Sequence, residues 1–168
     1  MLPDNDTIFK FECNYKSIND FKCSLSRSDN FFIFSQNIRS FNKNYDDLAV
    51  FLNTLNIDID VIVLSETWFS PTHTSDIDGY TGHHIYRDDR VGGGVSIFIR
   101  DTLRAVYISE MSFISDHLEC CTVQIRHSTS DRSNLTVVAL YRPPNTSVAD
   151  FTSCLEDVFL ECSQNRRM

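Results

Sequence analysis

The feature that most constrains the fold is a short apolar run, Val61 to Leu64, which ends abruptly at Ser65-Glu66-Thr67-Trp68. A run of this length with β-branched residues is typical of a strand buried on both faces. Such strands lie in sheets covered by helices, which keep their functional groups at the carboxyl ends of the strands. Glu66 follows such an end. From this stretch alone, Glu66 is either an exposed loop acid or a ligand for a cation.

The composition of the 168-residue chain indicates one folded domain or a piece of one. Apolar residues make up 42%, which is enough for a packed core. The net charge of −8 argues against a generic basic nucleic-acid binder, but it leaves open an enzyme that meets phosphates through a bound cation. No apolar run approaches a membrane span or a signal peptide, and no cysteines form a CxxC pair. We therefore expect an intracellular protein with reduced thiols and no membrane partner.

A strand, a helix and a second strand are predicted around this apolar run. A strand over residues 31–34 runs into polar residues through Ser40, and a second strand is expected over residues 59–65. Between them we expect a helix capped by Asn44, with one apolar face formed by Leu48, Phe51, Leu52 and Leu55. This βαβ unit predicts a parallel pair with a right-handed crossover. Asn37 and Glu66 should then leave neighbouring strands at the same edge of the sheet.

The second half of the chain predicts short strands joined by hairpin-sized links, at residues 84–86, 95–99, 105–108, 118–126 and 135–141. Alternation from Cys121 on predicts that the strand at 118–126 is half-buried. Ser147 is expected to cap a last helix with an apolar stripe of Phe151, Leu155, Val158, Phe159 and Cys162. Residues 1–30 are a polar lead-in, in which Ser17 and Asp20 predict a capping box and a short helix through Phe21 and Leu25.

Four motifs stand in order along the chain: QNIRSF at 36–41, LSETWF at 64–69, RVGGGVSIFIR at 90–100 and VVALYRPPN at 137–145. Together they resemble the endonuclease domain of non-LTR (LINE-type) retrotransposons, within the endonuclease/exonuclease/phosphatase superfamily. The resemblance covers residues 31–162. It implies an α/β fold, a four-layer α/β sandwich of the DNase I-like type, as a partial domain over residues 31–168.

The resemblance also implies Mg²⁺-dependent hydrolysis of a DNA phosphodiester. By motif, Glu66 matches the principal metal-binding carboxylate, Asn37 matches the asparagine near the metal and the scissile phosphate, and Tyr141 matches the tyrosine that hydrogen-bonds the phosphate. Mg²⁺ prefers oxygen ligands such as these. Arg39 and Arg90 are candidates for contacts with DNA phosphates. The implied partners are target-site DNA, the element's RNA and the reverse transcriptase domain of the parent polyprotein, in the nucleus.

The chain departs from the family pattern at its C-terminus. It stops at Met168, before the family's GDFN-like motif and terminal Ser-Asp-His, so we expect a C-terminally truncated domain with impaired activity and exposed strand edges. Ser115-Asp116-His117 matches that triplet only in its letters, because it precedes the Tyr141 strand. The alternatives are a catalytically dead fragment that binds metal or DNA weakly, or another phosphoesterase of the superfamily. Taken alone, Asn37 fits a helix-cap or turn residue, and Tyr141 fits a half-buried tyrosine whose hydroxyl contacts water.

Overall fold

The computed structural model describes residues 16–24, 31–126 and 134–165, and its contacts divide the chain into two units, residues 1–30 and 31–168. In the first unit, helix α1 spans Ile18–Ser24. Ser17 Oγ accepts the backbone N–H of Asp20 at 3.2 Å and donates to its carboxylate at 2.6 Å. Ser17 therefore caps the helix through the N–H of Asp20, which is one half of the predicted capping box, and the predicted end of the helix at Leu25 lies outside the described residues.

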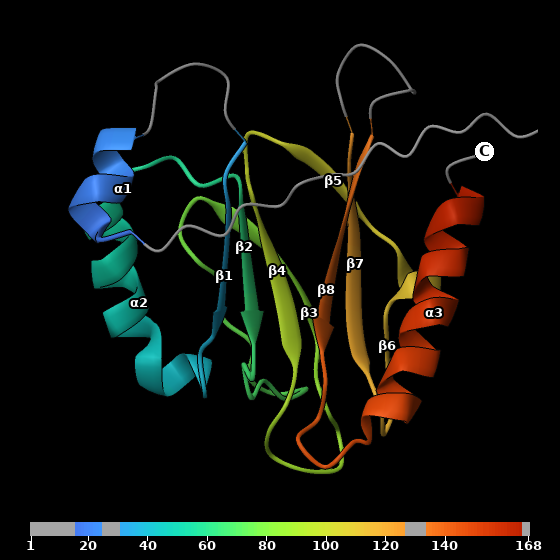
Figure 1. Ribbon diagram of the computed structural model, residues 1–168. Coiled ribbons are helices and arrows are strands. Elements are labelled where there is room, and N and C mark those ends of the chain that lie inside the picture. Colours follow the sequence, from blue (N-terminus) through green and yellow to red (C-terminus); the bar gives the residue numbers. More distant parts are fainter. Residues whose placement is uncertain (1–15, 25–30, 127–133, 166–168) are drawn as a thin grey trace, which may run out of the picture. The chain divides into compact units, whose positions relative to one another are not determined.

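The first sheet of the second unit has the strand order β1-β2-β4-β3. Its strands are β1 (Ile33–Asn37), β2 (Val61–Ser65), β3 (Tyr80–Ile85) and β4 (Val95–Arg100). Strands β1 and β2 are parallel neighbours, joined through helix α2 (Phe41–Leu55), and the other pairs are antiparallel. The parallel pair expected from the βαβ pattern is confirmed, so β1 and β2 end at the same edge (Figure 1).

The second sheet is built around the long strand β7 (Glu119–Arg126). Strand β8 (Leu135–Tyr141) pairs with β7 over almost its whole length. The other side of β7 is shared by β5 (Arg104–Tyr107) and β6 (Phe113–Ile114), which are joined by the 3₁₀ helix η1 (Ser109–Met111). Helix α3 (Val148–Asn165) follows β8. All these pairs are antiparallel, as predicted.

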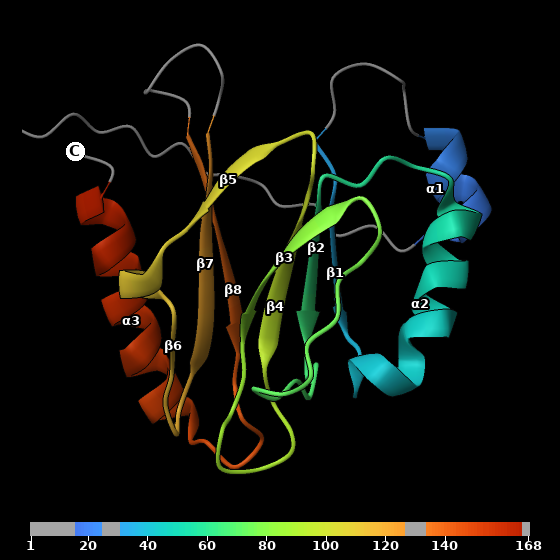
Figure 2. The same cartoon turned by 180° about the vertical axis from the view of Figure 1, so that it is seen from behind.

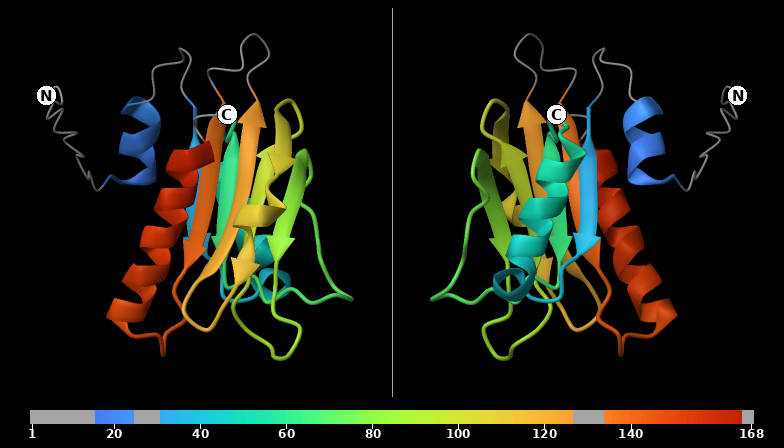
Figure 3. Two further views of the ribbon diagram at one scale, coloured as in Figure 1. Left: turned by 90° about the vertical axis from the view of Figure 1, so that its right-hand side faces the viewer. Right: turned by 90° about the vertical axis from the view of Figure 1, so that its left-hand side faces the viewer.

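Three apolar clusters arrange this unit in four layers. Helix α2 packs through Leu48 on the outer face of the first sheet, where Phe98 is fully buried. The inner faces of the two sheets meet in a cluster that includes Ile97 and Val123. Helix α3 covers the outer face of the second sheet around Val158. Figure 3 shows the two helices in front of opposite sheets, so the predicted four-layer α/β arrangement is confirmed.

Strands β1 and β3 differ most from their predicted bounds. Strand β1 begins at Ile33 and continues through Asn37, rather than covering residues 31–34, because its parallel pairing with β2 runs from Ile33 opposite Val61 to Asn37 opposite Ser65. The carbonyl of Phe32 accepts the backbone N–H groups of Asp60 and Val61 at 3.0 and 3.1 Å. Strand β3 begins at Tyr80 instead of residue 84, because Tyr80–Ile85 pairs with β4 although its sequence, YTGHHI, is not strongly apolar.

The start of α2 also differs from the prediction. The helix begins at Phe41, and Asn44 lies inside it, where its Nδ2 donates to the carbonyls of Ile38 and Arg39 at 2.8 and 2.9 Å. Ser40 occupies the N-cap with a φ of 84° and makes no capping side-chain bond. The prediction failed because the first turn is fixed by tertiary hydrogen bonds to the loop after β2, which the local sequence does not reveal.

Strand β7 and helix α3 each differ from the prediction in one respect. Strand β7 is buried on both faces, since fully buried Thr122 donates its hydroxyl to the carbonyl of Met111 at 2.8 Å. Ser147 caps α3 as predicted, because its Oγ accepts the backbone N–H of Asp150 at 3.1 Å. Phe159 is not part of the packed stripe, because 61% of its surface is exposed.

Strands β1 and β8 each have one partner strand within the described residues, and apolar side chains remain exposed on both. Ile33 is 54% exposed and Leu135 is 42% exposed, in agreement with the expected open edges. The four cysteines in the fully described part of the chain, Cys120, Cys121, Cys154 and Cys162, are not in disulfides. No helix in the described ranges has the length and apolar character needed to cross a membrane.

Candidate active site

Strands β1, β2 and β8 all end at one edge of the second unit (Figures 1 and 2). Asn37 is the last residue of β1, Glu66 follows β2, and Tyr141 is the last residue of β8. Asn37 Nδ2 donates to Glu66 Oε1 at 3.0 Å, and the hydroxyl of Tyr141 donates to the same oxygen at 3.0 Å. The structure thus brings together the three residues that the motifs singled out.

The backbone around Glu66 is strained. Glu66 has a φ of 54° and Trp68 a φ of 58°, a left-handed conformation that costs a non-glycine residue about 1–3 kcal/mol. The loop is held by the start of α2, because the carbonyls of Glu66 and Thr67 accept the N–H groups of Ser40 and Phe41 at 2.8 and 2.9 Å. Such strain persists only where surrounding contacts enforce it, and it is concentrated at functional sites.

Tyr141 is a hydrogen-bond donor in this arrangement. Burial raises the pKa of its phenol to about 12, helped by the hydrogen bond to Glu66 and by the negative charges of Glu66 and Glu119, while Arg87 acts in the opposite direction. The hydroxyl therefore keeps its proton at neutral pH. Tyr141 is suited to donate a hydrogen bond to an anion rather than to act as a base.

The charge of Glu66 is not neutralised by a basic side chain within the described residues. Its Oε1 accepts two bonds from neutral groups, and its Oε2 accepts none there. No group of three or more His, Cys, Asp or Glu residues in the described ranges has the arrangement of a metal site. Glu66 offers one carboxylate and Asn37 one amide oxygen, which are oxygen ligands of the kind that a hard divalent cation takes.

The two candidate arginines lie in loops beside this edge. Arg39 is exposed, has a φ of 48°, and lines a cavity of about 460 Å³ between β1 and α2 together with Asn37 and Asn44. Arg90 is exposed in the segment that joins β3 and β4 and extends beyond the strand ends (Figure 2). Neither arginine forms an ion pair within the described residues. Contact with DNA by either residue stays a prediction.

Ser115, Asp116 and His117 form the turn that leads into β7. Ser115 Oγ accepts the backbone N–H groups of His117 and Leu118 at 3.3 and 3.0 Å, which is a local turn function. The side chains of Asp116 and His117 are exposed. Within the described residues, none of the three bonds to Asn37, Glu66 or Tyr141, consistent with a chance match of letters.

A second charged group behind the edge was missed in the sequence analysis. Glu119, at the start of β7, is fully buried, and its Oε1 forms an ion pair with Nη2 of Arg87. Its Oε2 accepts the backbone N–H of Gly94 at 2.6 Å. The available clue was an acid placed at the start of a strand predicted to enter the core, because a buried carboxylate requires a partner.

Comparison with known proteins agrees with this geometry. The model of the endonuclease/exonuclease/phosphatase family matches residues 34–159, well over half of the chain. No curated protein sequence matches the chain.

Among solved structures, the chain is similar in fold to the endonuclease domain of TRAS1, a telomere-specific non-LTR retrotransposon, with a TM-score of 0.57 and 12% identity. The alignment covers 79% of this chain and 54% of that domain, so the chain spans about half of its length. Both comparisons and the four-layer fold lead to one conclusion: the chain belongs to the endonuclease/exonuclease/phosphatase family.

Proposed function

We propose that the chain carries the metal-binding half of a Mg²⁺-dependent endonuclease that nicks duplex DNA, of the kind found in non-LTR retrotransposons. The observation that supports this most is the state of Glu66. Its carboxylate is held on a strained backbone by two neutral donors, and no basic group neutralises it within the described residues. A half-buried carboxylate in this state is suited to bind a cation.

Each residue of the site has a separate task in this proposal. Glu66 binds the metal, and Asn37 orients the carboxylate through its Nδ2 and adds its amide oxygen. When bound, Mg²⁺ supplies Lewis-acid polarisation of a phosphoryl oxygen and a water of lowered pKa. Tyr141, which keeps its proton, donates to a non-bridging oxygen of the scissile phosphate and stabilises negative charge that develops there.

Substrate binding is assigned to the loops at the same edge. Arg39 and Arg90 are exposed and free of ion pairs in the described part of the chain, so both are available to phosphates of the DNA backbone. In a retrotransposon, the nick would prime reverse transcription of the element's RNA by an associated reverse transcriptase domain, in the nucleus. The fold likeness to the TRAS1 domain supports DNA as the substrate.

The second candidate function is metal binding without catalysis. It is favoured by the lack of a further cluster of acids or histidines around Glu66 in the described ranges. In that case the chain would bind a divalent cation and DNA weakly and leave phosphodiesters intact.

Nicking of supercoiled plasmid by the purified chain separates these functions. The assay compares Mg²⁺ with EDTA, and wild type with Glu66→Ala and with Glu156→Ala, which removes an exposed carboxylate on α3. We expect nicking that requires Mg²⁺, persists in Glu156→Ala and vanishes in Glu66→Ala. Nicking that is equal in all three proteins would identify a contaminating nuclease and contradict the proposal.

A parallel titration with Mn²⁺, followed by water proton relaxation, tests the binding step by itself. Binding that requires Glu66 but produces no nicks would support the second function. No binding by wild type would overturn both functions.

A further inference from the structure

The loop that carries Glu66 is bound on one side by the glycine segment between β3 and β4. The carbonyl of Gly94 accepts the backbone N–H of Thr67 at 3.4 Å, and the carbonyl of Gly93 accepts that of Trp68 at 3.1 Å. These are the two residues directly after Glu66. The position of the glycine segment therefore limits where the backbone of the metal-binding carboxylate can lie.

The glycine segment is in turn fixed by the buried pair of Arg87 and Glu119. Glu119 is fully buried, and 11% of the Arg87 side chain is exposed. One carboxylate oxygen of Glu119 pairs with Arg87, and the other accepts the N–H of Gly94 at 2.6 Å. A charge-assisted bond of this kind is shorter and stronger than a bond between neutral groups.

The glycines are required for this close approach. A Cβ atom on Gly93 would lie 2.5 Å from Glu119 Oε1 and 2.9 Å from the guanidinium of Arg87. A Cβ atom on Gly94 would lie 2.8 Å from the hydroxyl oxygen of Thr67. Both glycines also have left-handed φ angles, 70° and 85°, which other residues rarely adopt. Gly93 and Gly94 of the RVGGG motif thus allow the ion pair and the Glu66 loop to pack closely together.

We propose that Arg87 and Glu119 are positioning residues for Glu66: they hold Gly93 and Gly94 against Thr67 and Trp68, and so keep the Glu66 backbone in the conformation that aims its carboxylate at Asn37 and Tyr141. This assignment rests on the proposed function of Glu66 as the metal ligand. Residues that orient metal ligands commonly change metal affinity or activity by roughly 10- to 100-fold when they are replaced.

A second ion pair in the same unit provides a matched control. Arg100 Nη2 pairs with Asp60 Oδ1 at 2.5 Å, and Asp60 Oδ2 accepts the backbone N–H of Phe32 at 2.8 Å. This pair has the same arrangement as Arg87 and Glu119, because an arginine and a backbone N–H each bond to one oxygen of a buried carboxylate. It lies at the opposite end of β2, because Asp60 precedes that strand and Glu66 follows it.

The test compares double variants that replace each pair with apolar residues. Replacing a whole buried ion pair with apolar side chains is often neutral for stability, whereas removing one partner is not. We therefore expect Arg87→Met with Glu119→Leu to stay folded by circular dichroism but to bind Mn²⁺ roughly 10- to 100-fold more weakly than wild type. The control, Arg100→Met with Asp60→Leu, should bind Mn²⁺ within about twofold of wild type, because distant sites act independently.

A conservative variant separates positioning from general packing. Arg87→Met with Glu119→Gln removes both charges but keeps an oxygen for the N–H of Gly94, so it should recover Mn²⁺ affinity to within about threefold of wild type. Equal Mn²⁺ affinity in wild type and the leucine variant would overturn the inference. An equal loss of affinity in the leucine variant and its control would also overturn it.

Hydrogen exchange supplies a readout that does not depend on metal binding. We expect faster exchange of the amides of Thr67 and Trp68 in Arg87→Met with Glu119→Leu, but not in Arg100→Met with Asp60→Leu. If wild type binds no Mn²⁺ and this difference still appears, the proposed function fails while the support of the loop stands. The inference fails if exchange at both amides is unchanged in the leucine variant. If the leucine variant unfolds, the inference fails when the two amides of the glutamine variant exchange faster than those of wild type.

Discussion

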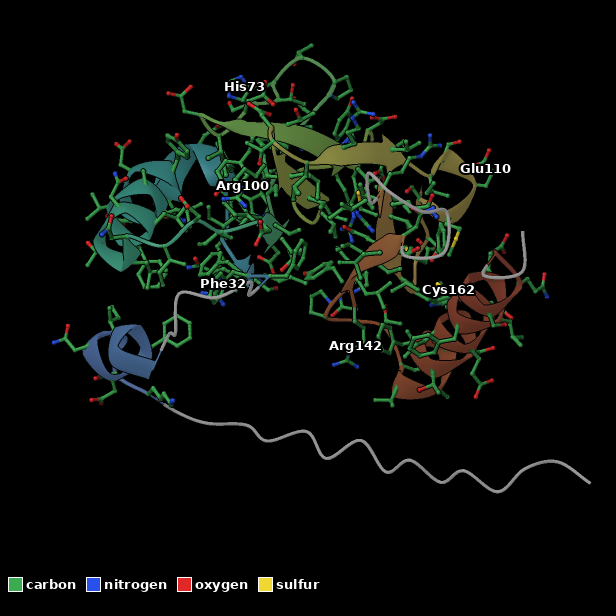
Figure 4. All side chains as sticks on the ribbon, turned by 90° about the horizontal axis from the view of Figure 1, so that it is seen from above. Phe32, His73, Arg100, Glu110, Arg142 and Cys162 are labelled. Atoms are coloured by element: carbon green, nitrogen blue, oxygen red, sulfur yellow. The ribbon has the colours of Figure 1, made fainter. Side chains whose placement is uncertain are left out.

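The two ends of strand β2 carry two carboxylates in opposite states. Asp60, before the strand, is 5% exposed, pairs with Arg100 and accepts the N–H of Phe32. Figure 4 views the molecule from this end and labels Arg100 and Phe32. Glu66, after the strand, is half-buried and receives only two neutral donors in the described part of the chain.

We interpret the difference as that between a structural acid and the proposed metal ligand. At the Asp60 end, both oxygens of the carboxylate are bonded inside the protein, one to Arg100 and the other to the N–H of Phe32. At the Glu66 end, the carboxylate has no charged partner among the described residues and the backbone is strained, which lowers stability unless a ligand uses the arrangement. An arginine–carboxylate pair is present near both ends, but the pair behind Glu66 bonds to Gly94 and makes no ion pair with Glu66.

The largest difference between the two ends should appear in stability when each carboxylate is removed in turn. Asp60→Ala leaves the charge of Arg100 and the N–H of Phe32 without their main acceptor, so the free energy of unfolding should fall by about 3 kcal/mol. Glu66→Ala removes a carboxylate from a left-handed position without leaving a charge behind, so it should change stability by less than about 1 kcal/mol. Urea denaturation measures both values.

For Mn²⁺ binding, the Glu66 substitution should have the larger effect and the Asp60 substitution the smaller. Glu66→Ala should abolish Mn²⁺ binding, whereas the folded fraction of Asp60→Ala should bind Mn²⁺ as wild type does. If Asp60→Ala lost metal binding while folded, or if Glu66→Ala lost as much stability as Asp60→Ala, the two ends would not differ in the way described.

The next effect in size is expected from Tyr141→Phe. Loss of one hydrogen-bond donor to a transition-state oxyanion commonly lowers kcat on the order of 100-fold. Stability should change little, because the hydroxyl bonds only to Glu66 among the described residues. Single-turnover nicking with Mg²⁺ measures the rate, and Tyr107→Phe, which alters a tyrosine that stacks on His83, is the matched control. A rate for Tyr141→Phe equal to that of the control would remove Tyr141 from the site.

A smaller effect should appear in the pH dependence of stability. Burial raises the pKa of folded Tyr141 from 10.0 to about 12, so the folded state retains a proton that the unfolded state releases. The resulting stabilisation is complete below pH 10 and is lost as the pH rises through 12. Urea denaturation in EDTA should therefore show a steeper alkaline fall for wild type than for Tyr141→Phe. Equal slopes would mean that Tyr141 is not held as described.

The sequence was sufficient to place β1 and β2, two of the three strands that carry the candidate site. The parallel pair β1 and β2 followed from the apolar run, the helix and the strand before it, and this pairing placed Asn37 and Glu66 together. Tyr141 could be assigned only through the resemblance of four motifs, because antiparallel strand order in the second sheet is not encoded in local periodicity. The residues thus meet across 29 and 75 positions of sequence.

Other features could not be predicted from the sequence because tertiary contacts determine them. The polar pattern of β7 suggested an exposed face, but Thr122 is buried and bonded to Met111. The start of α2 depends on hydrogen bonds from Ser40 and Phe41 to the Glu66 loop. Arg87 and Glu119 pair between separate segments, and neither belongs to a recognisable spacing.

The smallest expected effect tests whether the two ends of the first sheet differ in their tolerance of a side chain. Gly79 and Gly94 have similar φ angles, 80° and 85°, so an alanine at either position should cost about 1 kcal/mol of stability from backbone strain. A Cβ atom on Gly79 meets nothing within 4 Å, whereas on Gly94 it meets Thr67 at 2.8 Å. Because Thr67 follows Glu66, Gly94→Ala should also weaken Mn²⁺ binding, by several-fold, and Gly79→Ala should not. Calorimetric titration of both variants measures this difference, and equal affinities would mean that the glycine segment does not control the position of Glu66.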